Sequence, residues 1–267
     1  MPPVRAYSAM RIAVFCLSVV VMAPPIDAWA AFPSCAGHVQ TIGARLLRVD
    51  QNGSVILADG QALHLEGIRL PAGKIDRAPQ SVADDARKAI AQLLRVVPLA
   101  LSSVPPKIDR HNRERVQAFV GDQWVQAVLL NEGLARVSIA PDRTECAAKL
   151  FTVEAKARAA RRGLWAIPAY SVRNPSNIGR DVGTFQIVQG RVLNTSVRNG
   201  RAYLNFGADW RTDFTVSVDP VDMPNFRALG VDPRSYSGQT IQVRGWVRWY
   251  YGPEIEVANP QGIQVVP

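Results

Sequence analysis

The sequence predicts a mainly β fold with helices, organised as two units in a chain of 267 residues. Asn-Gly pairs at 52–53 and 199–200 stand between runs of strand-forming residues, which is a strong hairpin signal. Apolar residues recur at helical spacing in three segments between residues 81 and 163. Residues 168–183 contain Pro, Asn, Ser and Gly without an apolar period, as linkers do. We therefore divide the chain after its first thirty residues into a first unit at 31–168, a linker at 169–183 and a second unit at 184–267.

Residues 1–30 have the features of a secretory signal peptide. Arg5 and Arg11 supply a positive start, and residues 12–23 form an apolar run that is too short to cross a bilayer as a helix. The small residues of the Ala-Trp-Ala triplet at 28–30 then form a cleavage signal.

We accordingly expect cleavage near Ala30/Ala31 and a periplasmic or secreted mature protein. An uncleaved membrane anchor is the alternative, which the Pro24-Pro25 pair at the end of the apolar run disfavours. After removal of the signal, no apolar run of the sequence is long enough for a transmembrane segment.

The cysteines predict a disulfide bond. Removing the signal removes Cys16 and leaves Cys35 and Cys146, an even pair in an oxidising compartment. A bond between them closes a loop of 111 residues, worth roughly 4–5 kcal/mol in the chain-entropy description. Two unpaired buried thiols are the alternative.

The formal net charge of +9 suits a polyanionic partner, although charge alone is found more often in basic proteins without one. The excess persists after signal removal, because residues 1–30 contain only two arginines and one aspartate. Nucleic acid, an anionic membrane surface or lipopolysaccharide would fit such a charge. A basic protein without such a partner is the alternative.

Short strands open the first unit. The ranges 41–49, 55–58 and 62–65 are predicted as strands, and turns at 50–53 and 59–60 separate them. A helix is predicted from Ser81, where Asp84 follows three residues later as a near capping box. Its apolar face is formed by Ala86, Ile90, Leu93 and Leu94.

The rest of the first unit predicts a strand, a basic loop, a strand and two helices. Gly133 ends the first of these helices, and Gly163 lies past the end of the second. The second carries Leu150, Val153, Ala157 and Ala160 at helical spacing. The predicted ranges are 99–103, 107–115, 116–120 and 124–131, followed by the helix that starts near Asp142.

The second unit consists almost entirely of predicted strands. Three strands, a short helix and two strands follow one another, which is the order of a five-stranded OB-type barrel. We therefore predict a second small OB-like β-barrel. The ranges are 185–197, 201–206, 214–218, the helix at 223–229, then 240–250 and 255–257.

Four short sequences occur in a fixed order in the first unit: "HLEGIRLPAG", "DRHNRERVQAFV", "WVQAVLLNEGLARV" and "EAKARAARRGLW". Together they resemble the signature segments of the staphylococcal nuclease-like, or thermonuclease, domain family over roughly residues 41–165. The resemblance implies an OB-type five-stranded barrel with three helices. The second unit resembles the OB-like module that follows some exported bacterial members of the family.

Active members of this family cleave phosphodiesters with Ca²⁺, held by carboxylates and assisted by a carboxylate that activates water. By this resemblance, the first metal-binding position falls at Gly53 or Asn52, the second at Arg69 and the general base at Ala72. An arginine in place of a metal ligand repels a divalent cation by several kcal/mol at moderate dielectric. We therefore expect neither a metal site nor a cofactor, and we assign no catalytic residue.

The resemblance also implies two phosphate-binding arginines. Their positions fall at His64 and at Arg115, or at Arg113 if the two extra residues of this segment are placed differently. Substitute chemistry would have to come from an acid–base pair of His64 and His111, or from Glu66 in place of a lost carboxylate. Lone histidines and strand glutamates are more often structural, and the sequence contains no zinc-binding pattern.

A cluster of cations is the predicted nucleic-acid-binding surface of the first unit. A solvated loop stabilised by Asp109 and Glu114 is the alternative. The residues expected to gather around the former cleft are Arg69, Lys107, Arg110, Arg113 and Arg115.

In the second unit, the stretch "RGWVRWYYG" interleaves arginines with aromatic residues. Arg248 and Trp249 are candidate contacts to single-stranded nucleic acid, with Tyr251 expected on the same face as Trp249. The alternative is that Trp246 and Tyr250 fill the core of the barrel.

These observations lead to one principal hypothesis and two alternatives. The first is an exported thermonuclease-like protein with a degenerate site, which binds nucleic acid or another polyanion without Ca²⁺-dependent cleavage. The second is an active phosphodiesterase or endonuclease of the thermonuclease family with a rearranged site. The third is a structural envelope module that binds protein or glycan.

Overall fold

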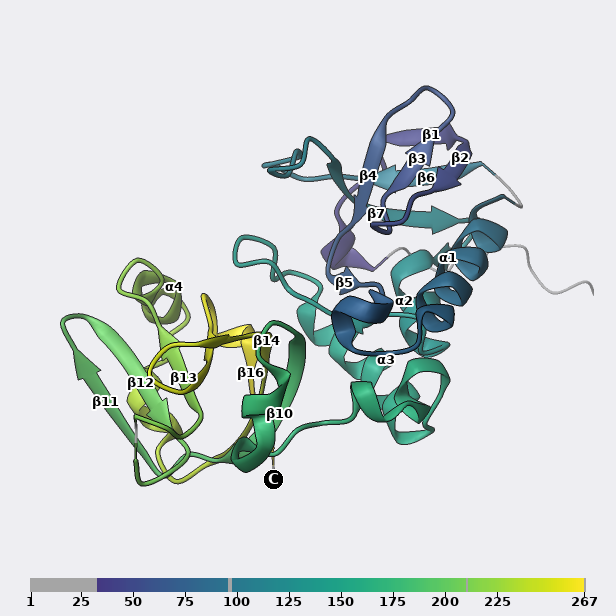
Figure 1. Cartoon of the computed structure of the whole chain (residues 1–267). Helices are drawn as coiled ribbons and strands as arrows, with labels where there is room; N and C mark the ends of the chain where they lie inside the picture. Colours follow the sequence, from purple (N-terminus) through teal and green to yellow (C-terminus); the bar gives the residue numbers. More distant parts are fainter. Residues whose placement is uncertain (1–32, 96–97, 210, 267) are drawn as a thin grey trace, which may run out of the picture.

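The computed structural model describes residues 33–95, 98–209 and 211–266 (Figure 1). The predicted signal peptide at 1–30 lies outside these residues. Two seven-stranded sheets occupy separate halves of the molecule, and most of the helices accompany the first (Figure 1). The fold is mainly β with helices, as predicted.

The first sheet curls, and the two strands at its ends are consecutive in the chain. Its strand order is β1-β6-β7-β4-β3-β2, with β8 paired to β7. β1 and β2 lie at opposite ends of this order, although only Arg45 separates them in the chain. The strands are β1 (Thr41–Ala44), β2 (Leu46–Val49), β3 (Val55–Leu57), β4 (Ala62–Leu65), β6 (Leu99–Ser102), β7 (Glu114–Val120) and β8 (Gln123–Trp124).

Two expectations about this sheet need correction. The strand predicted at 41–49 is broken, because the chain changes partner near Arg45, from β6 to β3. The basic loop is shorter than the predicted 107–115, because Glu114 and Arg115 belong to β7 and pair with β4. Arg115 is therefore fixed on a strand.

Three α-helices accompany the first sheet: α1 (Gln80–Arg95), α2 (Val125–Asn131) and α3 (Ala147–Ala159). α1 buries Ala86, Ile90 and Leu94, which lie on the predicted apolar face. α3 begins later than the predicted start near Asp142, because the side chain of Asp142 is bound to Arg115 instead of capping a helix. A two-stranded ribbon of β5 (Ile68–Arg69) and β9 (Arg136–Val137) lies beside these helices.

The second sheet has the strand order β10-β14-β15-β13-β12-β11, with β16 paired to β14. β10 and β11 are separated in the chain only by Val192 and Leu193, so the strand predicted at 185–197 is also broken between two sheet ends. The short helix α4 (Met223–Ala228) lies where a helix was predicted. The strands are β10 (Phe185–Arg191), β11 (Asn194–Arg198), β12 (Arg201–Asn205), β13 (Thr215–Val218), β14 (Thr240–Trp249), β15 (Pro253–Glu256) and β16 (Ile263–Val265), the last of which was not predicted.

The two sheets share one topology. In each, an interrupted first strand borders both ends, and one parallel pair occurs, β4 with β7 and β13 with β15. This order is consistent with the OB-type arrangement predicted for both units.

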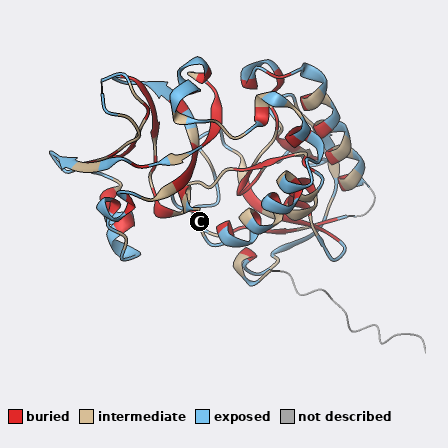
Figure 2. Cartoon of the chain, turned by 90° about the horizontal axis from the view of Figure 1, so that it is seen from below, coloured by how far each residue is buried: buried red, intermediate tan, exposed pale blue. Residues whose placement is uncertain are grey.

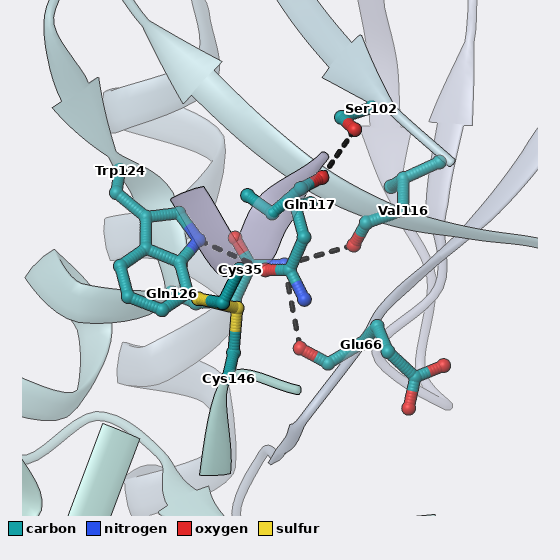
Figure 3. The surroundings of a disulfide bond; sticks show 9 residues. Cys35, Glu66, Ser102, Val116, Gln117, Trp124, Gln126 and Cys146 are labelled. Atoms are coloured by element: carbon teal, nitrogen blue, oxygen red, sulfur yellow. Dashed lines mark hydrogen bonds between the residues drawn. A yellow bond between two sulfur atoms is a disulfide. The ribbon is translucent and has the colours of Figure 1, made fainter. Parts of the chain in front are cut away.

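A disulfide bond joins Cys35, before β1, to Cys146 at the start of α3, which confirms the predicted pair (Figure 3). Gln126 lies beside it and donates to the backbone carbonyl of Val116 at 2.9 Å. The bond therefore anchors the segment before the first sheet to a helix far along the chain.

The connection between the sheets is packed rather than extended. The range predicted as a linker, 169–183, contains parts of two 3₁₀ segments, Pro168–Tyr170 and Pro175–Asp181. Tyr170 and Ile178 from this range are buried. An apolar period is absent here because single side chains, not a repeating face, make the contacts.

Buried positions run along the strands of both sheets, and the outer faces of the helices are exposed (Figure 2). Each sheet encloses its own apolar core. In the described ranges, no helix combines the length and the apolar character needed to cross a membrane.

Candidate functional site

The two positions that the sequence assigns to phosphate binding are neighbours in the first sheet. β4 and β7 pair in parallel, and their register places His64 opposite Arg115. Glu66 follows directly after β4, and the loop 107–113 leads directly into β7. The fold therefore brings His64, Glu66 and Arg115 together, next to the basic loop.

Arg115 is held by two carboxylates. Its Nε donates to Oε2 of Glu66 at 2.6 Å, and its Nη1 and Nη2 donate to the two carboxylate oxygens of Asp142 at 2.7 and 2.9 Å. Arg115 and Glu66 are both buried. The hydrogen bonds with Asp142 and Glu66 raise the pKa of Arg115, and the bond to Arg115 lowers the pKa of Asp142. This side chain is a permanent cation, and each of its three nitrogen atoms donates to a carboxylate.

His64 is half-buried beside this ion-pair network. Burial and the nearby positive charge of Arg113 lower the pKa of His64, so the imidazole is neutral at pH 7. His111 is exposed on the loop, where its Nε2 accepts from Nε of Arg110 at 3.1 Å. The proposed acid–base pair of the two histidines thus gains no support from their contacts.

The basic loop is organised around Asp109. The carboxylate accepts from the backbone N–H groups of His111 and Arg113 and from Nε of Arg113. Although burial opposes ionisation, the hydrogen bonds from Arg113 and His111 hold the pKa of Asp109 at about 2. Arg113 also donates to Ser54 Oγ at 3.2 Å. Arg113 is therefore bound within the loop by Asp109, as the alternative of a stabilised loop predicts.

Lys107 and Arg110 are the exposed cations of this loop. Nζ of Lys107 is 3.0 Å from Oε1 of Gln40, a neutral partner. Arg110 donates its Nε–H to the imidazole of His111, which is also a neutral partner. Their positive charges face solvent, unlike those of Arg113 and Arg115.

Arg69 does not join this cluster, which corrects the predicted grouping. Its guanidinium lies over the ring of Trp246 at 4.5 Å and over that of Phe185 at 5.6 Å, both from the second sheet. Its Nη2 is 3.8 Å from Asp76 Oδ1. The strand β5 that carries Arg69 pairs with β9, which directs this side chain towards the second sheet.

Gly53 and Ala72, which stand at the family's metal-binding and general-base positions, lie in backbone turns. Gly53 has φ +80 in the turn after β2, and Asp50 accepts the N–H groups of Asn52 and Ser54 in that turn at 2.9 and 2.8 Å. The N–H of Ala72 donates to Asp76 Oδ2 at 2.8 Å. The carboxylates nearest to these positions thus support turns.

The donor set around Arg115 does not fit a Ca²⁺ ion. Both candidate carboxylates, Glu66 and Asp142, are bound to a guanidinium, and Ca²⁺ takes six to eight oxygen ligands. The cavity beside Glu66 and Arg115 has a volume of about 20 Å³, which is room for a water molecule. Among the residues that the structure describes, no three His, Cys, Asp or Glu side chains converge as a metal-binding group.

The structure also contains buried ion pairs that sequence reasoning missed. Arg136 is 1% exposed and binds Asp76 at 3.1 Å, while its Nη1 donates to the carbonyl of Phe185. Arg244 of β14 binds the buried Glu154 of α3 at 2.8 Å. Through the carbonyl of Phe185 and through Glu154, these arginines join the second sheet to the β5–β9 ribbon and to α3 of the first unit. No local pattern distinguishes them from surface arginines.

Two expectations about the aromatic stretch of the second unit need correction: the core position of Trp246 and Tyr250, and the shared strand face of Trp249 and Tyr251. Trp246 and Tyr250 are 48% and 52% exposed, so they do not fill the core. Arg248 is bound to Glu254 and Glu256, and Trp249 is 63% exposed. Tyr251 lies past the end of β14 with φ 50, so it does not share a strand face with Trp249.

Comparison with protein families supports the resemblance found in the sequence. Residues 62–167 match the family model described as Staphylococcal nuclease homologue. The matched range begins at β4 and ends after α3, so it includes His64, Glu66, Arg115 and the basic loop. A search of curated proteins found no match to the chain. Residues 62–167 are therefore similar to the staphylococcal nuclease homologue family, which supports a thermonuclease-like domain in this part of the chain.

Proposed function

We propose that the protein binds nucleic acid or another polyanion through the nuclease-like domain without cleaving it in a Ca²⁺-dependent reaction. One observation carries the proposal. Glu66 and Asp142, the carboxylates beside the phosphate-binding positions, both form ion pairs with Arg115. On the adjacent loop, Lys107 and Arg110 are exposed.

The ion pairs argue against a metal site at this place. To bind Ca²⁺, Glu66 would have to leave Arg115, and breaking a buried pair costs about 3–5 kcal/mol. The freed guanidinium would then repel the cation at close range. Ca²⁺ would gain at most two carboxylates, fewer ligands than it needs to replace its water shell.

The loop cations support phosphate binding. Lys107 and Arg110 have neutral neighbours in place of carboxylate partners. A phosphate placed against them releases counterions from the nucleic acid, and this release makes the affinity depend on salt. The net charge of +9 adds long-range attraction for a polyanion.

The double variant Lys107→Ala/Arg110→Ala tests the proposal. Fluorescence anisotropy of a labelled single-stranded oligonucleotide should show weaker binding and a salt slope reduced by about 1.4, since each phosphate contact to a single strand contributes about 0.7. Lys88→Ala/Arg234→Ala is the control, because it removes the same charge from an exposed site on α1 and an exposed site in the second unit. Equal effects of the two double variants would leave only non-specific attraction and refute the role of the loop.

An active enzyme with a rearranged site is the second candidate. The observation that favours it is the convergence of two carboxylates on Arg115 next to His64. A substrate phosphate that drew Arg115 towards itself would free both carboxylates. Shortening of the oligonucleotide in the same assay would favour this candidate over binding alone.

We also propose that the protein is exported. The disulfide between Cys35 and Cys146 supports this, because such bonds persist in oxidising compartments. Cell fractionation with N-terminal sequencing should find a mature chain that begins near Ala31 outside the cytoplasm. A cytoplasmic chain that retains its first thirty residues would contradict the proposal.

A further inference from the structure

A groove of about 650 Å³ runs across the second sheet, remote in sequence from the nuclease-like domain. Strands β11 and β12, with Thr215 of β13, supply much of its lining, which also includes the β11–β12 turn at Asn199 and the β14–β15 turn at Tyr250 and Tyr251. This volume is typical of sites for small ligands. In an OB-type sheet, this face and these two connections are where chain-like ligands lie.

Aromatic rings line the groove. Tyr203 projects from β12, and Tyr250 and Tyr251 project from the β14–β15 turn with ring centroids 5.1 Å apart. Tyr250 and Tyr251 are exposed and Tyr203 is half-buried. Rings of this kind offer flat apolar faces with polar hydroxyl tips.

The charges of the groove are balanced, which distinguishes it from the basic loop. Arg201 lies between the rings of Tyr203 and Tyr250, and it binds Asp219 at 3.2 Å, Glu254 at 3.3 Å and Glu256 at 2.8 Å. Arg248 binds the same two glutamates.

Close by, burial and the negative charges of Glu256 and Asp219 raise the pKa of Asp222. The carboxylates therefore neutralise Arg201 and Arg248. The lining itself contains two arginines, Arg198 and Arg201, and two carboxylates, Asp219 and Glu254, so its formal charge is zero and a phosphate chain would meet acidic groups there.

Uncharged polar groups complete the lining. Nδ2 of Asn205 donates to Oδ1 of Asn194 at 2.7 Å, and Oγ1 of Thr215 is 3.4 Å from Oδ1 of Asn205. Amides and hydroxyls can both donate and accept hydrogen bonds, as the hydroxyl groups of a sugar require. The apolar faces of sugar rings in turn suit tyrosine rings.

We propose that this groove binds an uncharged oligosaccharide. The balanced charges favour a neutral ligand over a nucleic acid, and the tyrosines with the Asn–Thr lining supply stacking and hydrogen bonding. The site is independent of the proposed contact of the basic loop with polyanions, because the two share no residue.

The test uses the full mature chain and three neutral probes, chitohexaose, cellohexaose and maltohexaose, in isothermal titration calorimetry. At least one probe should bind with an affinity that is unchanged between low and high salt. Tyr250→Ala should weaken this binding by about tenfold, equivalent to about 1.4 kcal/mol. Trp249→Ala is the matched control: it removes a neighbouring exposed aromatic ring that does not line the groove, and should have little effect.

Three outcomes would overturn the proposal: none of the probes binds, Tyr250→Ala and Trp249→Ala have equal effects, or a twelve-nucleotide oligothymidylate displaces the bound sugar. The last outcome would assign the groove to single-stranded nucleic acid. Lys107→Ala/Arg110→Ala should leave sugar binding intact, so failure of the loop proposal and failure of the groove proposal are distinguishable.

Discussion

Arg115 and Arg113 keep the positive charge expected of phosphate-binding residues, but each has a fixed acidic partner. Arg115 is bound by Glu66 and Asp142, and Arg113 by Asp109. A cation in such a pair is less available to a ligand than the neighbouring Lys107, which faces solvent. Phosphate binding therefore depends on which cations lack a carboxylate partner. For Arg115, the partners Glu66 and Asp142 are distant in the sequence.

The pKa of Asp109 predicts how loop stability varies with pH. Because its folded value of about 2 is below the ordinary value of 3.8, ionised Asp109 stabilises the fold at pH values above about 4. This contribution is lost as the pH falls through about 2. Asp109→Asn should therefore lower the thermal midpoint at pH 7, with a difference from the original protein that shrinks towards pH 2.

Thermal unfolding followed by circular dichroism across this pH range checks the prediction. Asp85→Asn is the control, since its ion pair with Lys88 on α1 is exposed and 3.7 Å long. A difference for Asp109→Asn that stays constant from pH 7 to pH 2 would rule out the proposed ionic role.

Among the elements, those with local signals were predicted well. The turns at 50–53 and 199–200, the strand β4 and the helices α1 and α4 lie where the sequence placed them. Each depends on turn residues or on an apolar period within a few residues. The breaks at Arg45 and at 192–193 were missed because they arise where one strand changes partners across the sheet. The start of α3 was misplaced because Asp142 binds Arg115.

The disulfide is the covalent link between such elements. Because it closes a loop of 111 residues, Cys35→Ser/Cys146→Ser should lower the free energy of unfolding by roughly 4–5 kcal/mol. Urea denaturation of the variant and of the original protein, with and without reductant, measures this loss. The reduced original protein should match the variant, and a loss below about 1 kcal/mol would contradict the predicted contribution.

At the scale of the whole molecule, contacts of arginine side chains join the second sheet to the β5–β9 ribbon and to α3 of the first unit. Arg136 binds Asp76 and the carbonyl of Phe185, and Arg69 lies over Trp246. The sequence predicted two units and the family of the first, but it assigned Arg69 to ligand binding. Its actual role depends on β14, whose position no local pattern could reveal.

Arg136→Met should therefore destabilise the whole molecule. It would leave the carboxylate of Asp76, which is also buried, without its nearest cation, and such losses cost about 3–5 kcal/mol. Urea denaturation measures the effect, with Arg234→Met as the control because its pair with Asp232 lies at the surface. Similar small effects of both substitutions would show that the buried pair contributes little to the stability of the fold.

The central claim, binding without Ca²⁺-dependent cleavage, is tested most directly by the length of a bound oligonucleotide. An end-labelled single strand is incubated with the mature protein in Ca²⁺ or in a chelator, and its length is then measured on a denaturing gel. We predict a full-length strand in both conditions, retained by the protein at low salt. Shortening that requires Ca²⁺ and disappears in Glu66→Gln would contradict it.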